Sequence, residues 1–98
     1  MTIIAEVIQK YPLPIDAATL KLTLDDIEKK IILYEDLVKD FEKEHECDLE
    51  AFQKKVEEGE LPEHPSWEIA IEWGTAVDEL ERLRVIKRAL QWILNFLS

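Results

Sequence analysis

The sequence predicts an all-α protein built on a long antiparallel helical hairpin. Two stretches of the chain repeat apolar residues at alternating steps of three and four, which is the narrow seam of helices that pack side by side. Between these stretches lie Gly59, Pro62 and Pro65, which are residues that end helices and let the chain reverse. At 98 residues, one helical domain covering 1–98 is expected.

The first 22 residues are expected to be either helical or extended. Ile4 and Ile8 follow helical spacing until Pro12 interrupts it, because proline lacks an amide donor. Residues 19–24 then alternate polar side chains with leucines, which is the period of a short strand. A strand followed by two helices is the order of ribbon-helix-helix DNA-binding proteins, an alternative that the acidic composition opposes.

The first helix of the hairpin is predicted at residues 24–46. Thr23, followed three residues later by Asp26, is close to a capping box, so the helix should begin directly after this threonine. Acidic side chains in its first turn suit the helix dipole. Its predicted seam consists of Leu24, Ile27, Ile31, Tyr34, Val38 and Phe41.

A short satellite helix is predicted at residues 49–58, since Asp48 can cap its start and Gly59 can end it. The second helix of the hairpin is predicted at residues 67–97, after Ser66 as its cap. A single lysine interrupts its seam. That seam consists of Ile69, Trp73, Ala76, Leu80, Leu83, Lys87, Leu90, Leu94 and Leu97.

Composition and charge exclude several classes of protein. The net charge of -10 opposes direct binding to nucleic acid, whose phosphates are bound by lysine and arginine. The longest run without a charged residue is ten residues, 89–98, which is too short to span a membrane. The N-terminus lacks the basic flank and cleavage site of a signal peptide, so a cytoplasmic protein is expected. Cys47 is the lone cysteine and excludes an internal disulfide.

The charges are unevenly placed along the chain. Residues 40–81 carry fifteen acidic side chains against three lysines, whereas residues 82–98 carry four basic side chains and no acid. The acidic part suits a basic partner, and the basic end suits an acidic or neutral one.

The C-terminal end of the long helix is the predicted partner-binding surface. At 1.5 Å per residue, residues 67–97 span roughly 46 Å and residues 24–46 roughly 34 Å, so about eight residues should overhang. A second apolar stripe lies beside the seam there and needs a cover. We expect either residues 3–8 or another protein or second copy to cover it. The predicted partner-binding residues are Val85, Ala89, Trp92 and Phe96.

No catalytic, cofactor-binding or metal-binding residues are predicted, and an enzyme is not expected. Glu42 and His45 form a single Glu-x-x-His pair, whereas helical di-iron proteins use two, so we interpret the pair as a solvated helix face. Two acidic pairs resemble those with which helical nucleotide pyrophosphohydrolases hold magnesium, which prefers carboxylate oxygens. These pairs are Glu57 with Glu60, and Asp78 with Glu81.

Three segments resemble a known family: residues 48–61 (DLEAFQKKVEEGEL), 67–73 (WEIAIEW) and 78–83 (DELERL). The family comprises small acidic all-helical antitoxin-like proteins of archaeal and cyanobacterial toxin-antitoxin modules, and the resemblance covers about residues 35–83. It implies a protein that is made together with a small toxin, often an RNA-cleaving one, and neutralises the toxin by binding it.

The expected function is therefore a protein-protein interaction module, an antitoxin-like protein that binds a small basic toxin. RNA-binding toxins are commonly basic, so an acidic helical surface attracts them. Two alternatives stay open. One is a homodimeric helical structural or adaptor protein, and the other is a magnesium-dependent helical nucleotide pyrophosphohydrolase. The expected partner is a second protein or a second copy of the chain.

Overall fold

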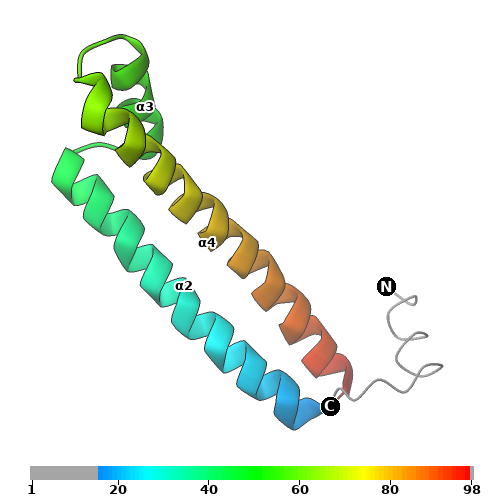
Figure 1. Cartoon of the computed structure of the whole chain (residues 1–98). Helices are drawn as coiled ribbons and strands as arrows, with labels where there is room; N and C mark the ends of the chain where they lie inside the picture. The colour runs from blue at the N-terminus through cyan, green and yellow to red at the C-terminus, as the bar shows by residue number, and fades with distance from the viewer. Residues whose placement is uncertain (1–15, 98) are drawn as a thin grey trace.

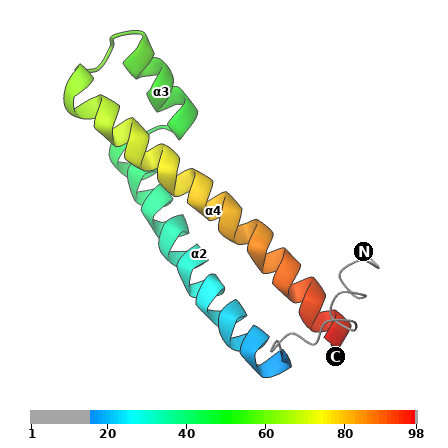
Figure 2. The ribbon, with the colours of Figure 1, turned by 45° about the vertical axis from the view of Figure 1, so that its right-hand side comes forward.

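The computed structural model describes residues 16–97, in which three helices follow one another (Figure 1). They are α2 (Ala17–His45), α3 (Leu49–Glu57) and α4 (Glu63–Leu97). No strand occurs among these described residues. Figures 1 and 2 show α2 and α4 side by side and antiparallel, with α3 against the beginning of α4. The predicted all-α hairpin with a satellite helix is confirmed, while the predictions for residues 1–15 lie outside the described part.

The start of α2 differs from the prediction, because the helix begins at Ala17 and not at Leu24. Asp16 is its N-cap, and the carboxylate accepts a hydrogen bond from the backbone amide of Thr19 at 2.7 Å. Thr23, the predicted cap, lies inside the helix, where its hydroxyl donates to the carbonyl oxygen of Thr19 at 3.0 Å. A threonine that bonds back to the preceding turn is compatible with a helix interior.

Of the two conformations that were expected for residues 19–24, helical or extended, the helical one is formed, so the ribbon of a ribbon-helix-helix protein is not formed there. Leu20 and Leu24 stand four residues apart, so in a helix they share the face that meets α4, and they are buried and half-buried. Leu22 points away and is exposed. Three leucines at alternate positions thus fit a helix with one leucine left on its surface.

The cap of α2 makes the start of this helix sensitive to acid. The hydrogen bond from the Thr19 amide lowers the pKa of Asp16 below its usual value, so the cap stabilises α2 above about pH 4, the ordinary aspartate pKa, and is lost on further acidification. We expect the amide resonance of Thr19 to shift in NMR spectra as the pH falls through the pKa of Asp16. In Asp16→Asn this titration should disappear, and its persistence would contradict the assigned cap.

The predicted overhang of the long helix was wrong. Because α2 begins at Ala17 and is 29 residues long, its first turn lies at the same end of the hairpin as the last turn of α4 (Figures 1 and 2). The error follows directly from the misplaced cap. The end of α4 at Leu97 agrees with the prediction.

The hairpin is held by the two predicted seams. The lysine that interrupts the seam of α4 is half-buried, and the Nζ of Lys87 lies 3.7 Å from a carboxylate oxygen of Glu28 on α2. A second pair across the helices joins Arg84 to Glu35 at 3.0 Å. The core between these helices contains Ile31, Leu80 and Leu83, against which Ile27, Tyr34 and Val38 pack.

Aromatic side chains close the hairpin near α3. Trp73 is fully buried; its ring stacks on Phe41 with centroids 5.4 Å apart and meets Phe52 of α3 at 5.3 Å. His45 stacks on the same indole at 5.7 Å and lies 4.7 Å from Phe52. The interpretation of Glu42 and His45 as a solvated helix face was therefore wrong for the histidine, which is half-buried among aromatic rings.

The ends of α3 follow the prediction within one residue. The carboxylate of Asp48 accepts a hydrogen bond from the Ala51 amide at 2.8 Å, and Gly59 leaves the helix with φ of 74°. The beginning of α4 is broken at His64, whose backbone is extended, so the regular helix starts close to the predicted residue 67. Ser66, the predicted cap, is buried there.

Candidate protein-binding surfaces

The predicted partner-binding residues form one stripe on α4, on the side turned away from α2. Val85 and Phe96 are 52% and 42% exposed, and Ala89 is exposed as well. Trp92 is half-buried and stacks on Phe96, with ring centroids 6.1 Å apart and planes 13° from parallel. We call Val85, Ala89, Trp92 and Phe96 the outer stripe. Because α2 extends to the same end of the hairpin, the stripe is one face of a packed helix and not a free end.

Basic side chains accompany the outer stripe. Arg88 stands one turn from both Val85 and Trp92, on the same side of α4, and has no ion-pair partner among the described residues. Arg82 is exposed near the start of the stripe but is paired with Glu79. This surface is therefore apolar with a basic margin.

A second apolar surface lies where α2 and α4 meet at the acidic end of the hairpin. It is a groove of about 370 Å³ between the two helices. Leu37 on α2 is 40% exposed and Ile71 on α4 is 52% exposed, which leaves two large aliphatic side chains open to solvent on opposite walls. We call it the hairpin groove, and it is lined by Tyr34, Leu37, Phe41, Ile71, Glu72, Thr75 and Ala76.

Acidic side chains surround the hairpin groove. Glu72 lines it, and Asp40 and Glu44 stand three and seven residues beyond Leu37 on the same side of α2. None of these three acids pairs with a basic side chain among residues 16–97. The groove is thus apolar at its centre and negative along its margins.

Further along α4, an ion pair between Arg82 and Glu79 balances part of the negative charge. Glu79 lies about one turn beyond Ala76, the last residue of α4 that lines the groove. The guanidinium of Arg82 donates to Glu79 through Nε at 3.0 Å and through Nη2, and this hydrogen bonding holds the pKa of Glu79 below its usual range. The pKa of Arg82 is raised by the same bonds, and Tyr34 lies near enough to contribute. The unbalanced negative charge therefore lies towards α3.

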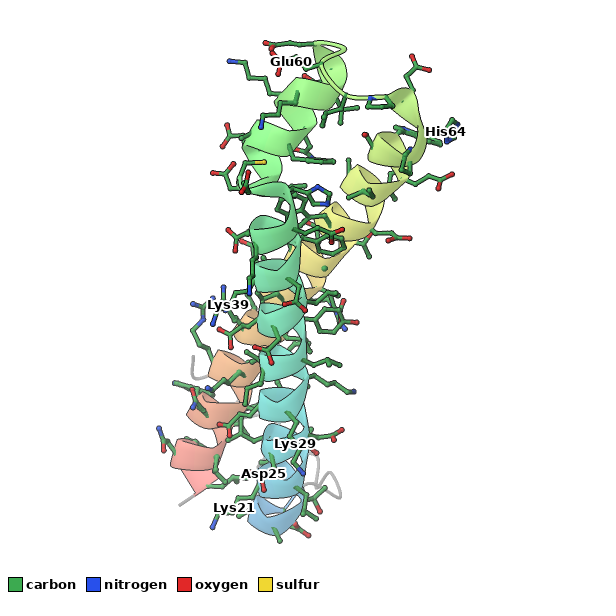
Figure 3. All side chains as sticks on the ribbon, turned by 90° about the vertical axis from the view of Figure 1, so that its left-hand side faces the viewer. Lys21, Asp25, Lys29, Lys39, Glu60 and His64 are labelled. Atoms are coloured by element: carbon green, nitrogen blue, oxygen red, sulfur yellow. The ribbon has the colours of Figure 1, made fainter. Side chains whose placement is uncertain are left out.

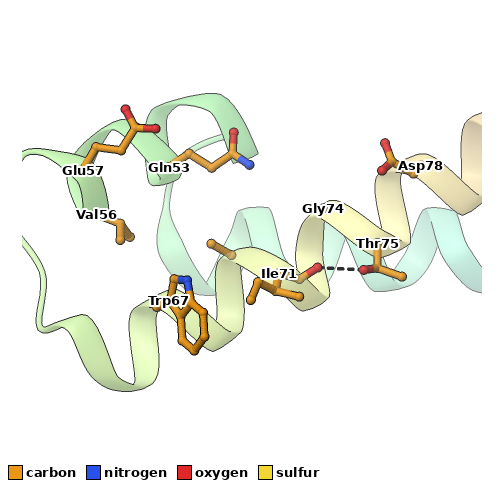
Figure 4. A pocket seen from close by; sticks show the side chains of 9 residues that line it. Gln53, Val56, Glu57, Trp67, Ile71, Gly74, Thr75 and Asp78 are labelled. Atoms are coloured by element: carbon orange, nitrogen blue, oxygen red, sulfur yellow. Dashed lines mark hydrogen bonds between the residues drawn. The ribbon is translucent and has the colours of Figure 1, made fainter.

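A second hollow lies between α3 and α4 (Figure 4), and one residue of each acidic pair noted in the sequence lines it. Glu57 and Asp78 both line it but stand at opposite ends of it in Figure 4, with Trp67 and Ile71 between them. Glu60 and Glu81 are not among its lining residues. In the described part of the chain, no group of three acidic, histidine or cysteine side chains gathers where a metal ion would bind. The structure therefore does not bring together the two acidic pairs on which the alternative of a nucleotide pyrophosphohydrolase depends.

Comparison with known proteins gives no relative. No family model matches the chain, and no similar protein was found among curated proteins or solved structures. The function therefore has to be argued from the surfaces themselves. Among residues 16–97, no helix combines the length and apolar character needed to cross a bilayer.

The remaining face of α2 is charged and offers no comparable surface. Figure 3 shows Lys21, Asp25 and Lys29 following one another along the helix, with Lys39 further on. Ile32 is a large apolar side chain on this face and is 58% exposed. The four residues one turn away from it on α2 are all charged: Glu28, Lys29, Glu35 and Asp36.

Sequence reasoning found the outer stripe but missed the hairpin groove. The stripe belongs to one helix, so its spacing is visible in a single segment. The groove combines side chains from two helices. Leu33 and Leu37, four residues apart and both exposed, were a usable signal, because two leucines off the seam of a charged helix form an apolar strip of their own.

Proposed function

We propose that this protein is an antitoxin-like binding module that captures and neutralises a small basic protein, such as an RNA-cleaving toxin. The observation that carries the proposal is the exposure of large apolar side chains on an otherwise charged hairpin. Four of these side chains lie on two surfaces, Val85 and Phe96 on the outer stripe and Leu37 and Ile71 in the hairpin groove. Exposed apolar surfaces bordered by charge are typical of protein interaction sites.

Net charge and buried apolar side chains contribute to different properties of the complex, the rate of association and the specificity of binding. The net charge of -10 attracts a basic partner and accelerates its association. Attraction alone does not select one partner, so the specificity has to come from side chains that become buried. Trp92 is of the residue type most enriched among such anchors, and its stacking on Phe96 holds its ring before a partner arrives.

The bound protein would neutralise an RNA-cleaving toxin by covering the surface with which the toxin binds RNA. An RNA-cleaving enzyme needs an open basic surface for the phosphates of its substrate. A hairpin whose described part measures 57 Å in its longest dimension and is acidic over much of its length can lie across such a surface and occupy it. No reaction by this chain is needed for that effect.

The test is the molar mass in solution, measured by light scattering with and without the product of the adjacent gene. We expect a heterocomplex with the wild type and its loss with Trp92→Asp, because a carboxylate there would be buried without a partner. Val85→Asp tests the same stripe at a position that is already exposed. Ile32→Asp is the matched control and should leave the complex intact. Circular dichroism should show equal helix content in all variants.

A homodimeric structural or adaptor protein is the second candidate, favoured by one observation. The outer stripe runs along one side of a straight helix segment, which is a surface that two copies can share about a two-fold axis. The same experiment decides between the candidates. The antitoxin proposal is wrong, and the homodimer replaces it, if three results are found together. The protein alone has twice the molar mass of one chain, Trp92→Asp has the molar mass of a single chain, and the product of the adjacent gene does not bind.

A further inference from the structure

We propose that the hairpin groove is the docking site for a basic amphipathic helix of the partner protein. This inference rests on the proposed function and adds the chemical nature of the element that is recognised. The outer stripe, predicted from the sequence, would then be a separate surface.

The shape of the groove suits a helix. It lies between two antiparallel helices, and a third helix laid along such a pair completes a three-helix arrangement with ordinary interhelical distances of about 8–10 Å. Leu37 and Ile71 stand on its two walls, 40% and 52% exposed, and the rings of Tyr34 and Phe41, one turn to either side of Leu37 on α2, also line it. Leucines of an incoming helix at positions i, i+4 and i+7 would pack between these walls and remove them from water.

The charge of the margins specifies a basic helix. Glu72, Asp40 and Glu44 border the apolar centre and have no basic partner among the described residues. Lysines or arginines flanking the leucines of an incoming helix would face these carboxylates. An acidic helix of the same apolar pattern would be repelled.

The same charges argue against a second copy of this chain in the groove. In a two-fold dimer the same surface faces itself, so the acids of one copy would approach those of the other. Like charges brought together at an interface oppose association. A protein with basic residues on its apolar helix meets no such repulsion.

The experiment uses the whole chain and two labelled peptides of about eighteen residues, roughly 27 Å as helices. Both carry leucines at i, i+4 and i+7 spacing; one has lysines at the remaining charged positions and the other glutamates. Fluorescence anisotropy should show that the lysine peptide binds the wild type at least about tenfold more tightly than the glutamate peptide does.

Variants locate the binding site. Leu37→Gln and Ile71→Gln should each weaken binding of the lysine peptide about tenfold, because each removes an aliphatic wall of the groove. Glu72→Gln should weaken binding less and make it less sensitive to salt. Ile32→Gln is the matched control, because Ile32 is also an exposed aliphatic residue but lies on the charged face of α2, and this variant should bind within about twofold of the wild type. Glutamine suits a helix, and circular dichroism checks that each variant keeps its helix content.

Three results would overturn the inference. The first is equal binding of the two peptides, and the second is binding that Leu37→Gln and Ile32→Gln change to the same extent, which would indicate attraction by net charge alone. The third is a dimer of the chain alone that dissociates in Leu37→Gln, because the occupant would then be a second copy.

Failure of this inference can be told apart from failure of the proposed function. A heterocomplex that survives Leu37→Gln but not Trp92→Asp leaves the antitoxin proposal in place and removes the groove from it. The opposite result is that the lysine peptide binds the groove but the product of the adjacent gene does not bind the protein. In that case the groove does recognise a basic helix, and the antitoxin proposal is wrong.

Discussion

Replacing Trp73 with alanine is expected to lower the free energy of unfolding by about 3–5 kcal/mol. The indole is fully buried and touches rings from both other helices, Phe41 and His45 of α2 and Phe52 of α3. Its removal leaves a cavity where the three helices meet. Because small domains have only about 5–15 kcal/mol in total, this loss is a large share of the stability. Urea unfolding followed by circular dichroism measures the loss.

Two controls separate packing from other effects of this substitution. Trp73→Phe keeps a ring in the cluster and should cost clearly less; Nε1 of Trp73 has no hydrogen-bond partner among the described residues, so phenylalanine loses no such bond. Trp67→Ala removes the same side chain from a position that is mostly exposed and should cost little. Equal losses for Trp73→Ala and Trp67→Ala would show that the aromatic cluster does not hold the hairpin together.

Leu83→Ala is expected to lower the free energy of unfolding by about 2–5 kcal/mol. Leu83 is 2% exposed and packs with Ile31 and Leu80 in the middle of the hairpin, far from the aromatic cluster. Alanine there loses the apolar contacts and leaves a void that the long, straight helices can close only in part. The same urea titration measures this change, and the transition should move to lower urea with an unchanged slope.

The matched control lies two residues further along the same helix. Val85→Ala removes methyl groups from a side chain that is 52% exposed and should change the stability by no more than about 0.5 kcal/mol. A loss as large as that of Leu83→Ala would mean that the outer stripe is buried in solution. In that case the stripe is occupied in the protein alone, and the heterocomplex proposed through Trp92 loses its free surface.

The hairpin was predictable because its seams repeat over many turns. Ile31 and Leu83 occupy the core positions that their spacing assigns, and even the lysine that breaks the second seam is explained by a glutamate opposite it. The start of α2 was not predictable in this way. Asp16 and Thr23 both qualify as caps by residue type, and only the packing of Leu20 against the rest of the fold favours the earlier one.

The candidate surfaces were predictable only where one helix contains them. Val85 and Trp92 stand on a single helix face, so their placement followed from spacing. Leu37 and Ile71 are far apart in sequence and meet across the groove only because the register of the two helices brings them together. The resemblance to antitoxin-like proteins stays a prediction, since it concerns a partner and not the fold of this chain.

The separation of charge along the hairpin gives the molecule an electric dipole. Acids dominate residues 40–81 near α3, and the four bases of residues 82–98 lie towards the opposite end of a body 57 Å long. A basic protein approaching by diffusion therefore meets a field that turns the α3 end towards it before contact. The rate of encounter should fall steeply as ionic strength rises, while the lifetime of the bound state, set by apolar contacts, should hardly change.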